Sequence, residues 1–128
     1  LKLGAAHALA VDTDSQAVCS TLENAELNDI LPAALETGKG SVGEILSGQF
    51  STTQAPLVMV NILAPIIIQL ITQGLGEMVS TGGTLLLSGI LDHQEDEVVR
   101  YLQQAGFTVC DRLSQNDWVS MAARKITP

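Results

Sequence analysis

Residues 57–65 read LVMVNILAP and give the clearest sign of how this chain is organised. The run over 57–60 is continuously apolar and ends at Asn61. Such a run is typical of a strand that is covered on both faces, as in a parallel sheet. Pro65 is tolerated in the first turn of a helix because its missing N–H has no helical partner there. The pattern therefore predicts a strand ending at Asn61 and an apolar helix over 65–78.

Similar patterns elsewhere predict an alternation of strands and helices. Alternation of this kind is typical of an α/β sheet with helices on both faces. We expect the last two strands to form an antiparallel pair at the edge of a mostly parallel sheet. The predicted strands are 7–11, 33–37, 57–61, 84–88, 107–113 and 118–124; the predicted helices are 15–27, 42–46, 65–78 and 92–104, with a turn at 80–83.

Length and composition set further bounds on the class of protein. The chain has 128 residues, which is the size of one domain. Apolar residues make up 46% and charged residues 16% of the sequence, which excludes a disordered chain. The net charge is −8 with only six Lys and Arg residues, which argues against binding nucleic acid through its phosphates.

The sequence also indicates in which compartment of the cell the protein is found. The apolar runs, such as 66–68 and 85–87, fall far short of the roughly 20 residues that a membrane helix needs. No basic segment followed by an apolar core suggests a secretory signal. Two cysteines, Cys19 and Cys110, lie far apart, which suits a reducing compartment. We therefore expect a cytoplasmic protein that does not bind membranes.

Two polar residues are candidates for a ligand site because each ends a predicted strand. In open α/β sheets, ligands bind beyond the carboxyl ends of the strands. Asp12 could accept both ribose hydroxyls of a nucleoside there, although it also fits a helix cap. Asn61 could offer a carbonyl acceptor to an amine, although Asn before a helix often only forms a turn. From the residues alone, both alternatives remain open at each position.

Other motifs give weaker signals. Residues 38–43 match G-x-G-x-x-G, but the strand before them is poor and no acid follows about 20 residues on, so we interpret them as a flexible loop. His7 and His93, taken with the two cysteines, show no metal-ligand spacing. We therefore predict no metal site.

Three segments together carry a family resemblance. They are Leu3-Gly4-Ala5 with Ala10-Val11-Asp12-Thr13-Asp14, then Val60-Asn61-Ile62-Leu63-Ala64-Pro65, then Gly82-Gly83-Thr84-Leu85-Leu86-Leu87-Ser88-Gly89-Ile90-Leu91. In this order and spacing they resemble the ribosomal-protein-L-eleven methyltransferases, which are class I S-adenosylmethionine-dependent enzymes. Asp117-Trp118-Val119 also resembles the closing strand of that family, so the resemblance covers nearly the whole chain.

The resemblance implies a Rossmann-like α/β fold, S-adenosylmethionine as cofactor, and methyl transfer to lysine and α-amino nitrogens of a large-subunit ribosomal protein. Asp12 matches the acid that holds the cofactor ribose. Asn61 matches the residue that lines the methyl group and the incoming amine, with Ile62 beside it. Ser41 and Val42 match a segment that covers the adenine. The resemblance thus implies Asn61 as the catalytic residue.

The sequence also departs from the family. Its glycine-rich cofactor loop and its substrate-recognition domain have no counterpart here. Residues 1–4 read like the last turn of a helix ended by Gly4. We therefore expect 1–128 to form part of a methyltransferase catalytic domain that lacks its first strand, and to be inactive alone. If the natural chain begins at Leu1, we expect negligible cofactor affinity.

Two alternatives and one structural expectation follow. The chain could be a non-catalytic α/β module that binds a partner protein and has lost cofactor binding. A nucleotide-binding oxidoreductase fragment is a weaker alternative because of the poor glycine fingerprint. Without a first strand, the strands near 9–11 and 57–60 would either pair directly or leave a slot for another segment, and unfilled edges would favour self-association.

Overall fold

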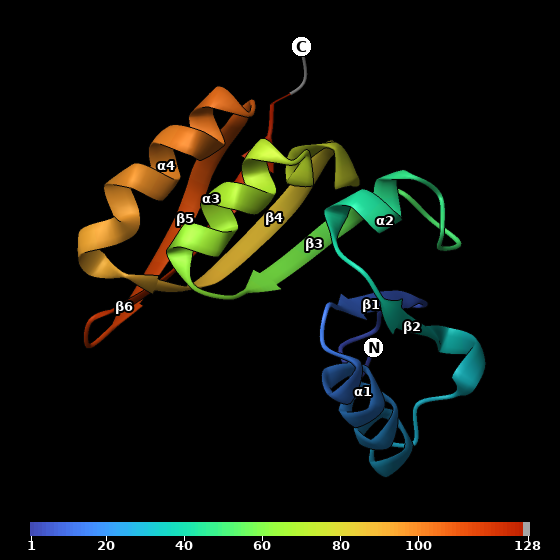
Figure 1. The fold of residues 1–128 in the computed structure, drawn as a ribbon. Helices are drawn as coiled ribbons and strands as arrows, with labels where there is room; N and C mark the ends of the chain where they lie inside the picture. The colour runs from blue at the N-terminus through green and yellow to red at the C-terminus, as the bar shows by residue number, and fades with distance from the viewer. Residues whose placement is uncertain (127–128) are drawn as a thin grey trace. The chain divides into compact units, whose positions relative to one another are not determined.

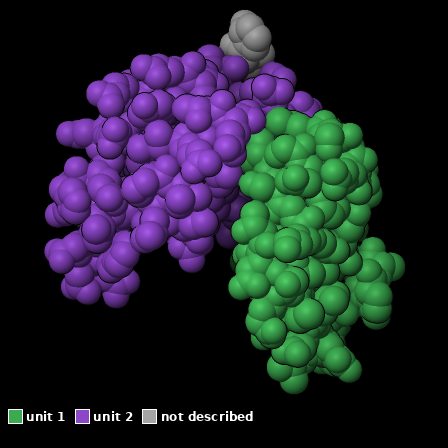
Figure 2. All heavy atoms as spheres, in the orientation of Figure 1, with its two compact units in different colours: residues 1–53 green, residues 54–128 purple. Residues whose placement is uncertain are grey.

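A computed structural model of the chain describes residues 1–126 and divides into two compact units, Leu1–Thr53 and Gln54–Pro128 (Figures 1 and 2). The first unit contains β1 (Ala8–Asp12), α1 (Ser15–Leu27), β2 (Leu35–Lys39) and α2 (Val42–Leu46), with a 3₁₀ turn at Pro32–Ala34. The second contains β3 (Ala55–Asn61), α3 (Ala64–Thr72), β4 (Val79–Leu91), α4 (Glu95–Gln104), β5 (Phe107–Gln115) and β6 (Trp118–Lys125), with 3₁₀ turns at Leu75–Met78 and Asp92–Gln94.

The first unit is a parallel β1–β2 pair with α1 packed against it. Helix α1 has the predicted bounds because its start is set locally: the carboxylate of Asp14 accepts the backbone N–H of Gln16 at 2.9 Å. The N-terminal residues form a turn in which Gly4 N–H donates to Leu1 at 2.9 Å, with Gly4 at φ +104°. Strand β2 begins two residues later than predicted, after the 3₁₀ turn.

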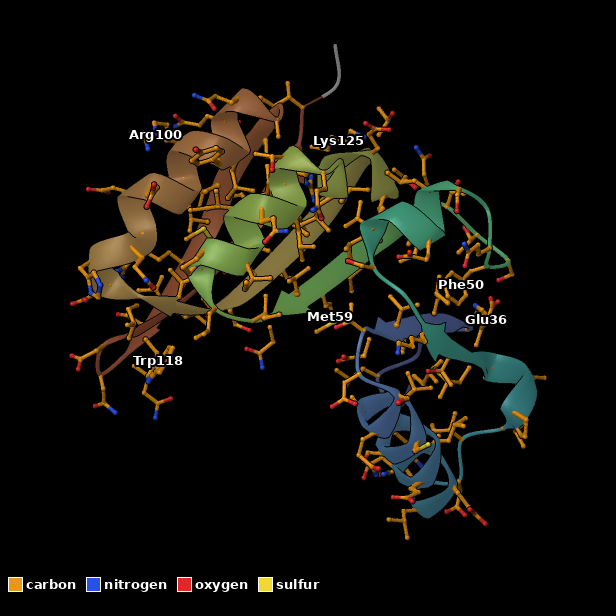
Figure 3. All side chains as sticks on the ribbon, viewed as in Figure 1. Glu36, Phe50, Met59, Arg100, Trp118 and Lys125 are labelled. Atoms are coloured by element: carbon orange, nitrogen blue, oxygen red, sulfur yellow. The ribbon has the colours of Figure 1, made fainter. Side chains whose placement is uncertain are left out.

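The glycine-rich segment 38–43 is not the loop that we predicted. Gly38 lies in β2 and Gly43 lies in α2. A Cβ atom on Gly38 would lie 2.7 Å from Cε1 of Phe50, so the ring packs directly on this backbone. The same part of the chain is held by the N–H of Ser51, which donates to the Glu36 carboxylate at 3.1 Å. Glycine at position 38 therefore makes room for an aromatic ring from its own chain (Figure 3).

The second unit is a four-stranded sheet with the order β3-β4-β6-β5 (Figure 1). Strands β3 and β4 are parallel, and β6 is antiparallel to both β4 and β5. The antiparallel pair at the end of the chain is therefore confirmed. Its two-residue connection contains Asn116 at φ +54°, a left-handed conformation that asparagine tolerates.

Helices α3 and α4 lie side by side on this sheet (Figure 1), so the two helices of the second unit share one face. Our expectation of helices on both faces concerned a sheet formed by the whole chain, and it stays a prediction because the two units are described separately. The core lies beneath the two helices. Its fully buried apolar side chains include Ile67, Leu75, Val79, Leu85, Leu87, Ile90, Val98, Leu102, Phe107 and Val119.

Strand β3 differs from our prediction that it is covered on both faces. Leu57 is 49% exposed and Met59 is 71% exposed, whereas Val58 and Val60 between them are half-buried. Successive side chains of a strand point to opposite faces of the sheet, so Leu57 and Met59 share one face and Val58 and Val60 share the other. The two helices of this unit lie on one face of the sheet and leave the other face uncovered within the described residues of the unit (Figure 1).

Two boundaries in the second unit also differ from the predictions. The apolar helix ends at Thr72 instead of 78, because Gly74 adopts φ +104° and the chain continues as a 3₁₀ turn. The predicted turn at 80–83 lies inside β4. There the pairing with β3 shifts from Ala55–Val79 to Leu57–Thr84, so the extra residues form an irregularity in a long strand. Helix α4 ends at Gln104 as predicted, with Gly106 after it, but it begins at Glu95 instead of 92, and Asp92–Gln94 forms a 3₁₀ turn.

Together the elements form a mixed α/β fold with parallel and antiparallel ladders. The described strands make two separate sheets, and β1 pairs with β2 instead of β3. Direct pairing of the strands near 9–11 and 57–60, one of our two expectations, is therefore not found. No helix within the described residues is both long and apolar enough to cross a membrane.

Candidate functional site

The second unit contains a pocket of about 840 Å³ at the carboxyl ends of β3 and β4, bounded also by the β5–β6 hairpin. This is the sheet edge at which α/β proteins bind ligands. Asn61 and Ile62, two of the predicted site residues, both line it. The structure thus brings these two residues together in one pocket.

The polar end of the pocket is formed where β3 meets β4. Asn61 pairs with Ser88 in the strand register, and both residues line the pocket. The backbone N–H of Ile62 donates to the carbonyl of Ser88 at 3.2 Å, which continues the ladder one residue past β3. An amide and a hydroxyl group therefore lie on neighbouring strands, where they can donate to and accept from a polar ligand.

Gly89 allows β4 to lie close to the backbone that follows Asn61. It adopts φ +83°, and a Cβ atom at this position would lie 2.6 Å from the carbonyl oxygen of Ile62. The β4–β6 register also shifts here, between Leu87 and Ile90. Any larger residue at 89 would collide with the backbone that follows Asn61, so glycine is required for β4 to pass this close.

An apolar wall comes from the β5–β6 hairpin. Leu113 is 69% exposed and Trp118 is 48% exposed, and both line the pocket. The side chain of Trp118 projects from the start of β6 (Figure 3). The hairpin is anchored to the end of β4 by Asp92 N–H, which donates to the carbonyl of Asp117 at 2.9 Å.

Our sequence reasoning placed Trp118 in a strand but did not assign the hairpin to the site. A usable signal was present: an aromatic residue stands at the first position of a strand, next to a polar turn. None of the described residues that line the pocket carries a charged side chain. The site is therefore apolar on one side, polar at Asn61 and Ser88, and uncharged throughout.

Asp12 lies in the first unit, exposed at the carboxyl end of β1. Its Oδ1 atom accepts the backbone N–H of Asp14 at 2.8 Å, and its carbonyl accepts the N–H of Gly40 at 3.0 Å. The N-cap of α1 is Asp14. Asp14, and not Asp12, therefore caps α1.

Ser41 and Val42 also lie in the first unit, at the start of α2. The backbone N–H of Ser41 donates to Oε2 of Glu44 at 2.8 Å, which satisfies one of the amides at the helix start. Val42 is 3% exposed, which leaves little of its side chain for a ligand. Within residues 1–126, no group of three or more His, Cys, Asp or Glu side chains is arranged to hold a metal ion.

Comparison with known proteins gives the family. The model of the family described as "Ribosomal protein L11 methyltransferase (PrmA)" matches residues 1–126. The chain belongs to this family. One member, the ribosomal protein L11 methyltransferase of Synechococcus elongatus, is 38% identical over 123 residues, which is 96% of this chain and 41% of that protein. The chain thus spans about two fifths of the length of this curated relative.

Solved structures agree with this ribosomal protein L11 methyltransferase assignment. The ribosomal protein L11 methylase of Lactobacillus delbrueckii subsp. bulgaricus superposes with a TM-score of 0.84 and 28% identity, covering 98% of this chain and 62% of that one. An RNA methyltransferase from Salinibacter ruber, solved in complex with S-adenosyl-L-homocysteine, superposes with a TM-score of 0.67 and 13% identity, covering 95% of this chain and 67% of that one. The second likeness shows that the Rossmann-like methyltransferase fold is shared.

Proposed function

We propose that residues 1–128 form part of the catalytic domain of a protein N-methyltransferase. In this proposal, a methyl group passes from S-adenosylmethionine to lysine side-chain and α-amino nitrogens of a large-subunit ribosomal protein. The observation that carries it is the position of Asn61: it ends a parallel strand and lines an uncharged pocket at the ligand-binding edge of the sheet. Family membership supports the reaction class.

For this reaction the main task of the chain is to position the cofactor and the acceptor amine. S-adenosylmethionine, when bound, supplies an electrophilic methyl group attached to a positively charged sulfur. The acceptor must be a neutral amine with a free lone pair. Asn61 Oδ1 would accept a hydrogen bond from that amine and orient it. An uncharged pocket favours the neutral amine over the ammonium ion, because it offers the ion no opposite charge.

The residues of the first unit fit the proposed cofactor. Asp12 is an exposed carboxylate at the end of a parallel strand, and the helix that follows is capped by Asp14 instead of Asp12. It would accept hydrogen bonds from the ribose hydroxyls. Ser41 and, in the second unit, Ile62 are proposed to contact the cofactor as well, with Ser41 and its neighbour Val42 beside the adenine. Because Val42 is only 3% exposed, its side chain would contribute little to that contact. The non-catalytic alternative is not favoured, since the family match extends over both units.

Two further parts of the proposal concern partners and location. A ribosomal-protein substrate requires the compartment that contains ribosomes, so we propose a cytoplasmic location, with no direct contact to nucleic acid or membrane.

The outer edge of β3 has no partner strand within the described residues. We propose that this edge supports self-association, which analytical ultracentrifugation over a range of concentrations would test.

The experiment for the function is a transfer assay with isotopically labelled S-adenosylmethionine and the recombinant large-subunit ribosomal protein. It uses the protein as its gene encodes it. We expect Asn61→Ala to reduce kcat by about tenfold or more, as loss of an orienting group does. Asp12→Asn should mainly raise the KM for S-adenosylmethionine.

The matched control is Asn24→Ala, an exposed position of α1, which should leave both constants unchanged. No transfer by the unaltered protein, or full activity of Asn61→Ala, would contradict the proposed function.

A further inference from the structure

We propose that Glu95 and Arg112 are positioning residues for the pocket of the second unit. They hold the outer half of β5, which we define as residues 111–115, in place along one side of that pocket. Neither residue lines the pocket itself. The inference rests on the proposed function and goes beyond it, because it gives two residues outside the site an effect on substrate binding.

The hairpin of β5 and β6 supplies more than half of the described residues around the pocket. They are Leu113, Ser114, Gln115, Trp118, Val119 and Ser120. The remaining lining residues come from the ends of β3 and β4 and the residues that follow Asn61. The width of the pocket therefore depends on where the hairpin lies relative to Asn61.

The outer half of β5 has little packing of its own. The register with β6 shifts between Val109 and Asp111, and such a shift bends a strand. Phe107, before the shift, is 1% exposed, whereas every residue from 110 to 115 is exposed. Strand β5 is also the outermost strand of the sheet, so within the described residues a ladder holds it along one edge only.

A side-chain contact ties this half of β5 to the helix layer. Arg112 Nε and Nη2 donate to the two carboxylate oxygens of Glu95 at 2.6 and 2.7 Å. Glu95 is the first residue of α4. Two parallel hydrogen bonds fix the orientation of a guanidinium group, which a single contact does not. The pair thus fixes Arg112, and the next residue, Leu113, lines the pocket.

The other strand of the hairpin has an anchor of its own. The backbone N–H of Asp92 donates to the carbonyl of Asp117 at 2.9 Å, and the next residue, Trp118, pairs with Leu91 of β4. These contacts involve the backbone and do not depend on the side chain of Glu95. Loss of the Glu95 carboxylate should therefore release the outer half of β5 and leave the start of β6 in place.

Release of this half of β5 should weaken substrate binding and leave the transfer step unchanged. Asn61 belongs to β3, on the other side of the pocket, and would still orient the reacting amine. The hairpin would contact parts of the substrate that do not react, so its displacement removes binding equally from the ground state and the transition state. Since an exposed ion pair contributes modestly, Glu95→Gln should raise the KM for the ribosomal protein about threefold with kcat unchanged.

Hydrogen–deuterium exchange followed by mass spectrometry measures the same release without any need for activity. In Glu95→Gln the amides of residues 111–115 should exchange about threefold faster, because this segment opens more readily, whereas those of α3 should exchange at the unaltered rate. Glu95 lies outside the peptide that is measured, so the intrinsic exchange rates of 111–115 stay the same. Both experiments use the protein as its gene encodes it.

Further variants test whether the two residues act as a pair. Arg112→Gln should raise KM as much as Glu95→Gln, and the double variant should raise it no further. Arg112→Lys keeps the charge without the planar fork and should give an intermediate KM. The matched control, Glu97→Gln, removes a carboxylate that is 3.6 Å from Arg100 on the same helix and should change neither KM nor exchange.

The outcomes separate this inference from the proposed function. An unchanged KM for Glu95→Gln, a fall in kcat at constant KM, or additive effects in the double variant would overturn the positioning role. If the unaltered protein transfers no methyl group, the proposed function fails and the exchange experiment decides the inference. Faster exchange confined to 111–115 then supports it, and unchanged exchange overturns it.

Discussion

Arg112 of β5 and Glu95 of α4 form an ion pair with two hydrogen bonds. Arg112 Nε donates to Oε1 of Glu95 at 2.6 Å, and Nη2 donates to Oε2 at 2.7 Å. The planar guanidinium matches both oxygens of a carboxylate, which gives this contact a defined geometry. The pair therefore connects a helix to the outermost strand of the four-stranded sheet.

The stabilisation that this pair provides should be present near neutral pH and lost in acid. The hydrogen bond from Arg112 holds the pKa of the Glu95 carboxyl below its usual value of 4.5. A lowered folded-state pKa stabilises the fold above about pH 4.5 and ceases to do so as the pH falls through the folded-state pKa. Glu95→Gln should therefore lower the Tm slightly at about pH 7 and by less at about pH 3, as followed by circular dichroism.

Glu97→Gln is the matched control, since Glu97 is paired to Arg100 only at 3.6 Å on the surface of the same helix. It should show no such pH dependence. An equal loss of Tm for Glu95→Gln at both pH values would contradict a role for the ionised pair.

Gly38→Ala should destabilise the first unit through a clash with Phe50. The new Cβ would lie 2.7 Å from Cε1 of the ring, so we expect a loss of about 1–3 kcal/mol in the free energy of unfolding. In Gly38→Ala/Phe50→Ala the ring is gone, so the double variant should lose less than the sum of the two single variants. Urea unfolding of all four proteins measures this coupling, and strict additivity would refute the packing explanation.

Gly89→Ala should destabilise the second unit more than Gly82→Ala. Both glycines lie in β4 with positive φ, at +83° and +71°. A Cβ on Gly82 meets nothing within 4 Å, whereas a Cβ on Gly89 meets the Ile62 carbonyl at 2.6 Å. We expect about 1–2 kcal/mol for the backbone conformation in each case, and an additional 1–3 kcal/mol, roughly, for the collision in Gly89→Ala. Denaturant unfolding compares the two, and equal losses would show that the close approach does not matter.

Lys125→Met should lower the free energy of unfolding by about 1–3 kcal/mol, because two partly buried carbonyl groups lose their donor. Lys125 Nζ donates to the carbonyls of Val79 at 2.7 Å and Gly76 at 2.9 Å, which fixes the start of β4 to the end of β6. Methionine keeps the aliphatic stem without the ammonium group. The control Lys39→Met removes an exposed lysine from the first unit, and thermal unfolding should give the same Tm as the unaltered chain.

Several elements could be predicted because their signals are local. The bounds of α1 follow from the cap at Asp14, those of α2 from the residues around Ser41, and the final hairpin from alternating residues on either side of a polar turn. The apolar helix over 65–78 was predicted too long, because its apolar pattern continues past Gly74, where the backbone turns into a left-handed conformation.

The sequence by itself determined the local elements, the family, and the chemical groups that stand at the strand ends, Asp12 and Asn61. Only the tertiary structure decided that β3 is an edge strand with exposed Leu57 and Met59, and that the pocket beside Asn61 includes Trp118. The physical reason is that caps and turns depend on neighbouring residues, whereas the order of strands in a sheet depends on pairing between distant segments. That pairing alone sets which side chains share a pocket.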